Sequence, residues 1–448
     1  MYIKKLHVQN IKCFSDLSLD FTRNKNEVRL WTALLGNNGV GKSLILQCIA
    51  LVLAGGSAST ELLPYPKHWV RWNEEKGSIE ATVSLTEHDP GYPRKDLDLK
   101  YWIVGEKGSK IDGKFVDGPR IYEDNSNDNE IFRKVMSSKK GCLVCAYGPF
   151  RRISKDDERI QSNKSGSNPR SARLTTLFYD GAIPSDLSGW LSQLEYASIK
   201  TKKKVDELRY EKATKILDEI LPGYTFAEIT SDRKVWFTTY DGRIRVPLTE
   251  LSDGYKSVIS WSSDLMMQMF ESSKELSDEP LTGKGVVIID EIDIHLHPQG
   301  QRKVISWLKE HFPNIQFIIS SHSPFVAQPL NHDEILILTR GENETQIEPL
   351  DEDLVGWSVD EVLTSKAFGL ETTHDEETEN LLSDYKKLLA SKHSYKSLDE
   401  YTKNYEILKA KLQKRLPPSN NMVTLLEYKH ELEELIEKKR NKSKTKTK

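Results

Sequence analysis

The sequence lacks a long hydrophobic run, a strong net charge and a zinc-like cysteine pattern. No segment approaches the roughly 20 apolar residues that a membrane-spanning helix needs, and the first residues lack the apolar core of a signal peptide. We therefore expect a cytoplasmic location and no membrane partner. Because the formal net charge is only -3, any attraction to nucleic acid must come from local patches.

The four cysteines lie in apolar stretches, and no second Cys or His pair stands at zinc-like spacing from Cys142 and Cys145. We expect reduced thiols in the core. With 448 residues, 37% of them hydrophobic, and nine Trp, the chain is long enough for two to four domain-sized units with buried cores.

Hydrophobic patterning predicts an α/β fold. Residues 2–21 alternate as in a hairpin of two half-buried strands, and residues 30–35 form a short strand that leads through glycines into a buried helix over 44–53. Continuous apolar runs at 286–289 and 317–319 are of parallel-strand type, with an amphipathic helix over 299–312 between them. A further strand is expected over 334–339.

Other segments are read more coarsely. Short alternating runs at 79–85, 97–104 and 143–147 predict an antiparallel sheet region over 78–150. Residues 153–170 are polar and predict a mobile loop, and 172–221 reads as helical. Beyond 350 the chain is charged and helical, and it closes in a lysine-rich tail.

A phosphate-binding loop follows the first short strand. The pattern G-x-x-x-x-G-K-[ST] is met with a strand before it and a helix after it. Its glycines let backbone N–H groups turn toward phosphates at the positive end of the helix, the lysine would reach the terminal phosphates, and the serine hydroxyl would bind Mg²⁺. The loop consists of Gly36, Asn37, Asn38, Gly39, Val40, Gly41, Lys42 and Ser43.

Polar residues end the two later apolar strands. Asp290 and Glu291 follow the run 286–289, where one carboxylate would hold Mg²⁺ and the next would orient or deprotonate the attacking water. His322 follows the run 317–319 at the carboxyl edge of the sheet, where ligands of open α/β sheets bind. A neutral imidazole there would donate to a γ-phosphate and accept from water.

A signature-like segment, Leu251–Ser257, precedes a helix expected to begin near Val258. Ser252 and the N–H groups around Gly254 would present donors and a helix dipole to an anion. Taken alone the segment is a capped turn, and it gains meaning from its order between the phosphate loop and the acidic strand end.

These four elements, in this order, resemble the ABC-type ATPase heads of the SMC, RecF and OLD-like group. The hairpin at 3–14 and the stretch 290–298 look like that group's first hairpin and its extended Walker B motif and D-loop. The resemblance implies a P-loop fold with ATP and Mg²⁺ as cofactors, and two heads that dimerise around ATP. Ser252, Asp253 and Gly254 would act in trans, Asp293 would lie in the dimer-facing D-loop, and Lys12 would approach the nucleotide.

Within that group, residues 147–151 and 356–363 look similar to segments of bacterial anti-phage ATPases of the PtuA type, from Septu systems or retrons. Two departures stand out. Where a Q-loop glutamine is usual the chain has Tyr147, with Gln161 in the polar loop as the alternative, and the phosphate loop and signature are about 207 residues apart, too few for long SMC arms.

On this resemblance the chain divides into five parts: lobe I with an antiparallel β region (1–150), a loop and helical insertion (151–245), lobe II (246–345), a helical C-terminal interaction region (346–437) and a disordered basic tail (438–448). For residues 371–437, helices packed on the head and a docking or oligomerisation module are both compatible with the sequence. The tail is either solvated or in contact with nucleic-acid phosphates.

The expected function is an ATPase switch, a dimer or a higher assembly of dimers, that regulates a separate HNH-type, PtuB-like nuclease, with DNA or RNA as trigger or target. After residue 345 the chain offers polar helices and no apolar strand ending in Glu-Gly, so no Toprim nuclease is expected in cis. A DNA-repair ATPase of RecF type is the alternative. A transporter ATPase would need a different signature, because Asp253 and Tyr255 replace two of its residues.

Overall fold

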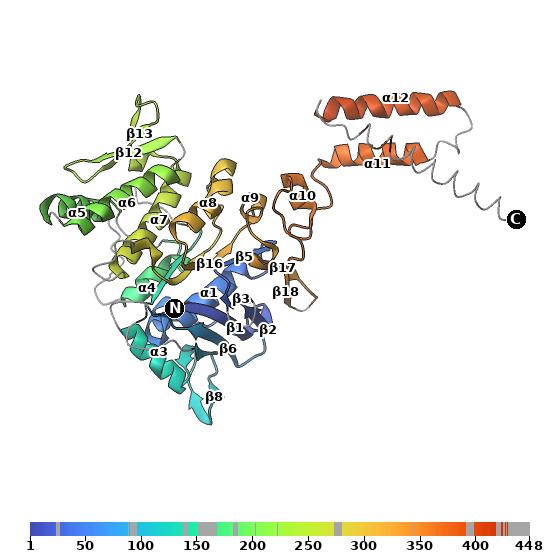
Figure 1. Cartoon of the computed structure of the whole chain (residues 1–448). Coiled ribbons are helices and arrows are strands. Elements are labelled where there is room, and N and C mark those ends of the chain that lie inside the picture. The colour runs from blue at the N-terminus through green and yellow to red at the C-terminus, as the bar shows by residue number, and fades with distance from the viewer. Residues whose placement is uncertain are drawn as a thin grey trace. The chain divides into compact units, whose positions relative to one another are not determined.

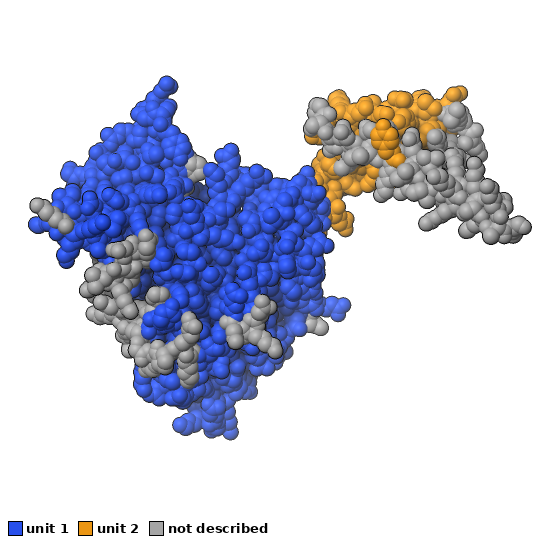
Figure 2. Space-filling model, in the orientation of Figure 1, with its two compact units in different colours: residues 1–368 blue, residues 369–448 orange. Residues whose placement is uncertain are grey.

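The computed structural model describes residues 1–23, 27–87, 89, 96–137, 142–150, 168–181, 187–201, 203–221, 223–272, 280–342, 344–390, 398–417, 423, 426 and 428. The chain forms two compact units, residues 1–368 and 369–448 (Figure 2). Within the described residues no helix is both long and apolar enough to cross a membrane. The predicted loop over 153–170 falls outside the described residues apart from 168–170, and the basic tail falls wholly outside them.

A six-stranded sheet forms the centre of the first unit, in the order β11-β15-β16-β5-β17-β18. The first five strands run parallel and β18 is antiparallel to β17. This confirms the predicted α/β class. The strands are β11 (Leu143–Tyr147), β15 (Gly285–Ile289), β16 (Ile315–Ser320), β5 (Trp31–Gly36), β17 (Ile335–Arg340) and β18 (Thr345–Pro349).

Both faces of this sheet are covered, which explains the continuous apolar runs. Along β15, Val286 and Ile288 belong to one hydrophobic cluster and Val287 and Ile289 to the other. The first cluster lies on the side of α1 (Lys42–Ala54), most of whose side chains are buried. The second joins the sheet to α7 (Asp253–Ser272) and α8 (Pro298–His311).

A five-stranded antiparallel sheet packs on the other side of α1, in the order β10-β7-β6-β1-β2. The hairpin predicted for residues 2–21 is confirmed as its β1–β2 pair. The strands are β1 (Tyr2–Ile11), β2 (Phe14–Asp20), β6 (Lys76–Ser84), β7 (Asp96–Val104) and β10 (Arg120–Glu123). The helix that carries the phosphate loop is thus held between two sheets, which fixes the position of its N-terminus.

One prediction about these regions is wrong and another is incomplete. Residues 143–147, assigned to the antiparallel region, form β11 and pair in parallel with β15. Every residue of β11 is buried, as expected of a strand covered on both faces. The insertion over 151–245, expected to be a loop and helices, also contains an antiparallel sheet of β12 (Tyr224–Ile229), β13 (Val235–Thr239) and β14 (Arg245–Pro247). Its helices are α4 (Pro169–Leu174), α5 (Leu187–Thr201) and α6 (Lys204–Ile220).

Smaller elements complete the first unit (Figure 1). They are α2 (Gly56–Leu62), α3 (Asn127–Ser137), α9 (Pro324–Ala327), α10 (Val359–Thr364) and the short pairs β3 (Thr22–Arg23) with β4 (Glu27–Val28) and β8 (Ser109–Ile111) with β9 (Lys114–Val116). The cysteines are free thiols, three of them buried, as expected. In the second unit, α11 (Glu376–Ala390) and α12 (Leu398–Arg415) share a small core that includes Leu382, Tyr385 and Leu412.

Candidate nucleotide site

The phosphate loop connects the end of β5 to the start of α1. Gly36, Gly39 and Gly41 have φ angles of 139°, 77° and 99°, which side chains disfavour. A Cβ on Gly41 would lie 2.7 Å from Cζ of Phe14, and one on Gly36 would lie 2.2 Å from the carbonyl oxygen of Leu338. No side chain caps the N-terminus of α1 at Gly41, so its first N–H groups face the space where helix termini bind anions.

Lys42 lies in the first turn of α1 and is buried. Its Nζ donates to the carbonyl oxygens of Gly36 at 2.8 Å and Asn37 at 3.0 Å. Burial lowers the pKa of Lys42, and the carboxylates of Asp290, Glu291 and Asp293 oppose this effect. The loop lysine and the acidic strand end therefore belong to one electrostatic site.

The acidic strand end is fixed by Ser320, at the end of the neighbouring strand β16. The Ser320 hydroxyl donates to Oδ1 of buried Asp290 and accepts from the backbone N–H of Glu291 at 2.8 Å. The backbone N–H of Asp290 donates to the carbonyl of Tyr147 at 2.8 Å. Sequence reasoning missed the role of Ser320, although a serine directly after an apolar strand run was its signal.

His322 follows β16 and lies near the same carboxylates. Its backbone N–H donates to Oδ1 of Asp293 at 3.3 Å. Burial and the neighbouring Lys42 ammonium lower the pKa of His322 below its usual 6.5, against the opposing effect of Asp293, Glu291 and Asp290. The imidazole is therefore neutral at pH 7, as a hydrogen-bonding group between phosphate and water has to be.

The signature segment lies beside the D-loop of its own chain, residues 293–296. Helix α7 begins at Asp253, five residues earlier than predicted, because the backbone N–H of Lys256 already bonds to the Ser252 carbonyl and that of Tyr255 contacts the Ser252 hydroxyl at 3.5 Å. A Cβ on Gly254 would lie 2.1 Å from the His295 carbonyl oxygen. The D-loop backbone therefore lies directly against Gly254.

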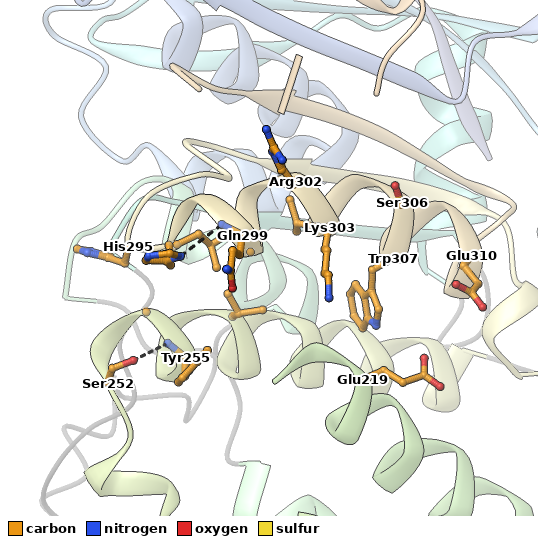
Figure 3. A pocket seen from close by; sticks show the side chains of 16 residues that line it. Glu219, Ser252, Tyr255, His295, Gln299, Arg302, Lys303, Ser306, Trp307 and Glu310 are labelled. Carbon is orange, nitrogen blue, oxygen red and sulfur yellow. Dashed lines mark hydrogen bonds between the residues drawn. The ribbon is translucent and has the colours of Figure 1, made fainter. Parts of the chain in front are cut away.

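A cavity of about 520 Å³ adjoins this contact. Figure 3 shows α8 along one side of it and α7 along the other, with Lys303 and Trp307 pointing into it. Asp253 instead forms an ion pair with Lys256 at 2.9 Å, and its side chain is 84% exposed. Of the three signature residues expected to act in trans, Ser252 and Gly254 line the cavity.

The polar groups at the sheet edge fit magnesium triphosphate. Ser43 is exposed in the first turn of α1, and Asp290 lies at the strand end. Among the described residues no cluster of three His, Cys, Asp or Glu residues could hold a metal by itself. A Mg²⁺ ion that accompanies a nucleotide usually binds through one or two protein oxygens and the substrate phosphates.

Tyr147, at the position where a Q-loop glutamine was expected, forms a buried hydrogen bond to the signature helix α7. The Tyr147 phenol donates to Oδ2 of Asp264 on α7 at 2.8 Å, and both side chains are buried. Since the Tyr147 carbonyl also accepts from Asp290, this residue joins the signature helix to the acidic strand end. The alternative, Gln161, lies outside the described residues.

Together the central sheet, the phosphate loop and the acidic strand end define a P-loop ATPase of ABC type. Comparison with known proteins is consistent with this class: residues 5–222 match a family described as "AAA domain", and residues 149–327 match one described as "AAA domain, putative AbiEii toxin, Type IV TA system".

The chain belongs to the ATPase family that includes the Septu protein PtuA and the retron ATPases, within the SMC, RecF and OLD-like group. It is 32% identical to the retron Vc95 probable ATPase of Vibrio cholerae serotype O1 biovar El Tor, over 75% of this chain and 74% of that protein. It is 30% identical to the Septu protein PtuA of Bacillus mycoides (strain KBAB4), over 92% of this chain but 51% of that protein. The chain thus spans about half the length of this PtuA.

A solved structure of an SMC head bound to the C-winged helix domain of ScpA aligns at a TM-score of 0.49 and 16% identity. The alignment covers 78% of this chain and 98% of that chain.

Proposed function

We propose that this chain binds and hydrolyses ATP between two heads, and that the closed dimer regulates a separate nuclease in defence against phage. The observation that carries the proposal is the convergence of one ammonium, several carboxylates and a neutral imidazole on the open N-terminus of α1. These are the groups that phosphoryl transfer requires.

Each group has a defined task in this proposal. The loop N–H groups from Gly36 to Ser43 and the Lys42 ammonium bind the phosphates. The Ser43 hydroxyl and Asp290 would hold Mg²⁺, which would neutralise charge on the phosphates. Water attacks the γ-phosphorus, the bond to the ADP oxygen breaks, and Glu291 takes the water proton. His322 donates to the transferred phosphoryl group.

The second head would complete the site. Ser252 and Gly254 stand at the N-terminus of α7, where a hydroxyl and N–H groups favour an anion. In the proposed dimer these donors meet the γ-phosphate held by the other head, and the D-loop with Asp293 faces that head. The supporting observation is that Gly254 packs directly against the D-loop backbone of its own chain.

The role in defence rests on the relatives. One is named a Septu protein and another a retron ATPase. An HNH-type nuclease similar to PtuB would be the regulated partner, with DNA or RNA as trigger or target.

The test is Glu291→Gln, with the exposed Glu352→Gln as the matched control. Loss of the base should lower kcat by about 10²–10⁴-fold, while ATP binding persists and dimers accumulate in sedimentation with ATP. Turnover equal to that of the control variant would exclude Glu291 as the base, and a wild-type protein that stays monomeric with ATP would refute head closure.

A second experiment tests whether the nuclease is a separate protein. Supercoiled plasmid should stay intact with the purified chain, Mg²⁺ and ATP. Cutting that survives Lys42→Ala would contradict a separate nuclease.

A further inference from the structure

The D-loop turn is held at both ends by one side-chain amide. The turn runs from Asp293 to Leu296, closed by the Leu296 N–H on the Asp293 carbonyl at 3.1 Å, and contains His295 with φ of 64°. Gln301, in the first turn of α8, donates through Nε2 to the Asp293 carbonyl at 3.2 Å and to the Leu296 carbonyl at 2.9 Å. One amide nitrogen therefore ties the two ends of the turn to a rigid helix.

The oxygen atom of the same Gln301 amide contacts the loop that follows β16 and contains His322, here called the switch histidine. The Ser323 hydroxyl donates to Oε1 of Gln301 at 2.7 Å and accepts from the backbone N–H of Phe325 at 3.1 Å, where it caps α9. Ser323 is buried and directly follows His322. The His322 backbone N–H donates to the Asp293 carboxylate. The contacts therefore form a closed ring that runs from the D-loop through the Gln301 amide to the loop of His322 and back to the D-loop.

The chemistry of the partners sets the orientation of the amide. On one side of the amide lie the carbonyl oxygens of Asp293 and Leu296, which can only accept, so the NH₂ group must face them. On the other side, the Ser323 hydroxyl accepts from a backbone N–H and donates its proton to the amide oxygen. A rotated amide would place oxygen against two carbonyl oxygens. Gln301 therefore has a single orientation that satisfies both loops.

We propose that Gln301 is a positioning residue that couples the D-loop to the switch histidine. This coupling rests on the proposed function. When a second head displaces the D-loop, the displacement reaches His322 through the Gln301 amide. Gln301 need not touch nucleotide for this. It sets where Asp293 and His322 lie relative to each other, so that hydrolysis follows head closure.

The experiment compares Gln301→Met with Gln299→Met in the full chain. Methionine keeps the length of the side chain and removes both hydrogen-bonding groups, and Gln299 lies two residues earlier on the same helix. For Gln301→Met we expect kcat to fall about ten-fold or more, the effect of about one lost hydrogen bond, with KM and the Kd for a fluorescent ATP analogue within two-fold of wild type. Ser323→Ala should lower kcat in the same way. The double variant should be no worse than Gln301→Met alone, because both act through one amide.

Hydrogen exchange gives a readout that needs no turnover. In Gln301→Met, amides of residues 293–297 and 321–323 should exchange about ten-fold faster, while those of residues 36–43 stay unchanged. If the wild type hydrolyses no ATP but both segments loosen together, the coupling stands and the proposed function fails. If the wild type is active and Gln301→Met matches Gln299→Met in turnover and exchange, or if the losses in the double variant add, the coupling is refuted. Should Gln301→Met not fold, Gln301→Glu replaces it, since it keeps the acceptor for Ser323 and opposes the D-loop carbonyls.

Discussion

Tyr147→Phe removes one oxygen atom from the contact between the signature helix and the central sheet. The Tyr147 phenol is 1% exposed and donates to Asp264 at 2.8 Å, while its ring packs on Trp261 with centroids 6.0 Å apart. Burial and the Asp264 charge raise the pKa of Tyr147 well above its usual value, so the phenol keeps its proton. Phenylalanine preserves the ring contact and deletes the donor.

The expected loss is about 2 kcal/mol of unfolding free energy. A hydrogen bond to a charged acceptor contributes about 1.5–3 kcal/mol, and leaving a buried carboxylate oxygen without its donor adds to the cost. The apolar area of the ring does not change, so no cavity term applies. In a unit of this size the loss corresponds to a fall in Tm of about 2–4 °C.

Urea unfolding at pH 7, followed by tryptophan fluorescence, measures this loss. Tyr240→Phe is the matched control, because the Tyr240 side chain is 68% exposed. A double-mutant cycle with Asp264→Ala isolates the pair, and the coupling energy should account for most of the single-variant effect. A Tyr147→Phe midpoint equal to that of the control, or strict additivity in the cycle, would refute the assigned bond.

Two further predictions concern the nucleotide site. Gly254→Ala places a Cβ 2.1 Å from the His295 carbonyl oxygen, so α7 must shift; ATP-dependent dimers should fall at least about ten-fold in sedimentation, a loss of about 1.4 kcal/mol. The control is Gly181→Ala, because a Cβ added at Gly181 would have no neighbouring heavy atom within 4 Å. Equal dimer formation by both variants would contradict the role of Gly254 in the dimer. The second prediction is pH dependence: because the pKa of His322 lies below 6.5 and the neutral form is active, kcat should persist below pH 6.5 and fall as pH drops through the lowered pKa. His322→Gln should remove that acid limb, and an acid limb at or above pH 6.5 in the wild type would count against the assignment.

Local patterns predicted the strands and helix that carry the motifs. Runs such as 286–289 are buried on both faces and are followed by acidic residues, so both their structure and their position at a sheet edge were readable from the sequence. The sequence does not show which strand will be the partner of another. Residues 143–147 pair with a strand about 140 residues later, and nothing in five apolar residues specifies which sheet they join. Strand β12 was missed because none of its residues is fully buried and its alternation is weak.

The contacts that organise the site were beyond sequence reasoning for the same reason. Ser320 and Asp290 are 30 residues apart and Tyr147 and Asp264 are 117 apart. A hydroxyl in the sequence does not reveal its acceptor, because a side-chain bond depends on which strands become neighbours. Motifs give the identity of the groups at the sheet edge, whereas the fold gives the pairs that hold those groups.

Backbone strain is concentrated in the segment that links these groups. Glu291 and His295 have φ angles of 47° and 64°, a conformation that costs non-glycine residues about 1–2 kcal/mol each. A left-handed residue directly after Asp290 turns the chain sharply at the sheet edge, and a second one at His295 brings its carbonyl against Gly254. The cost is offset by the Ser320 bond to the Glu291 N–H and by the Gln301 bonds across the D-loop. Because the contacts that stabilise the strained segment also reach the histidine loop, they form the path by which the proposed coupling would carry a displacement of the D-loop to His322.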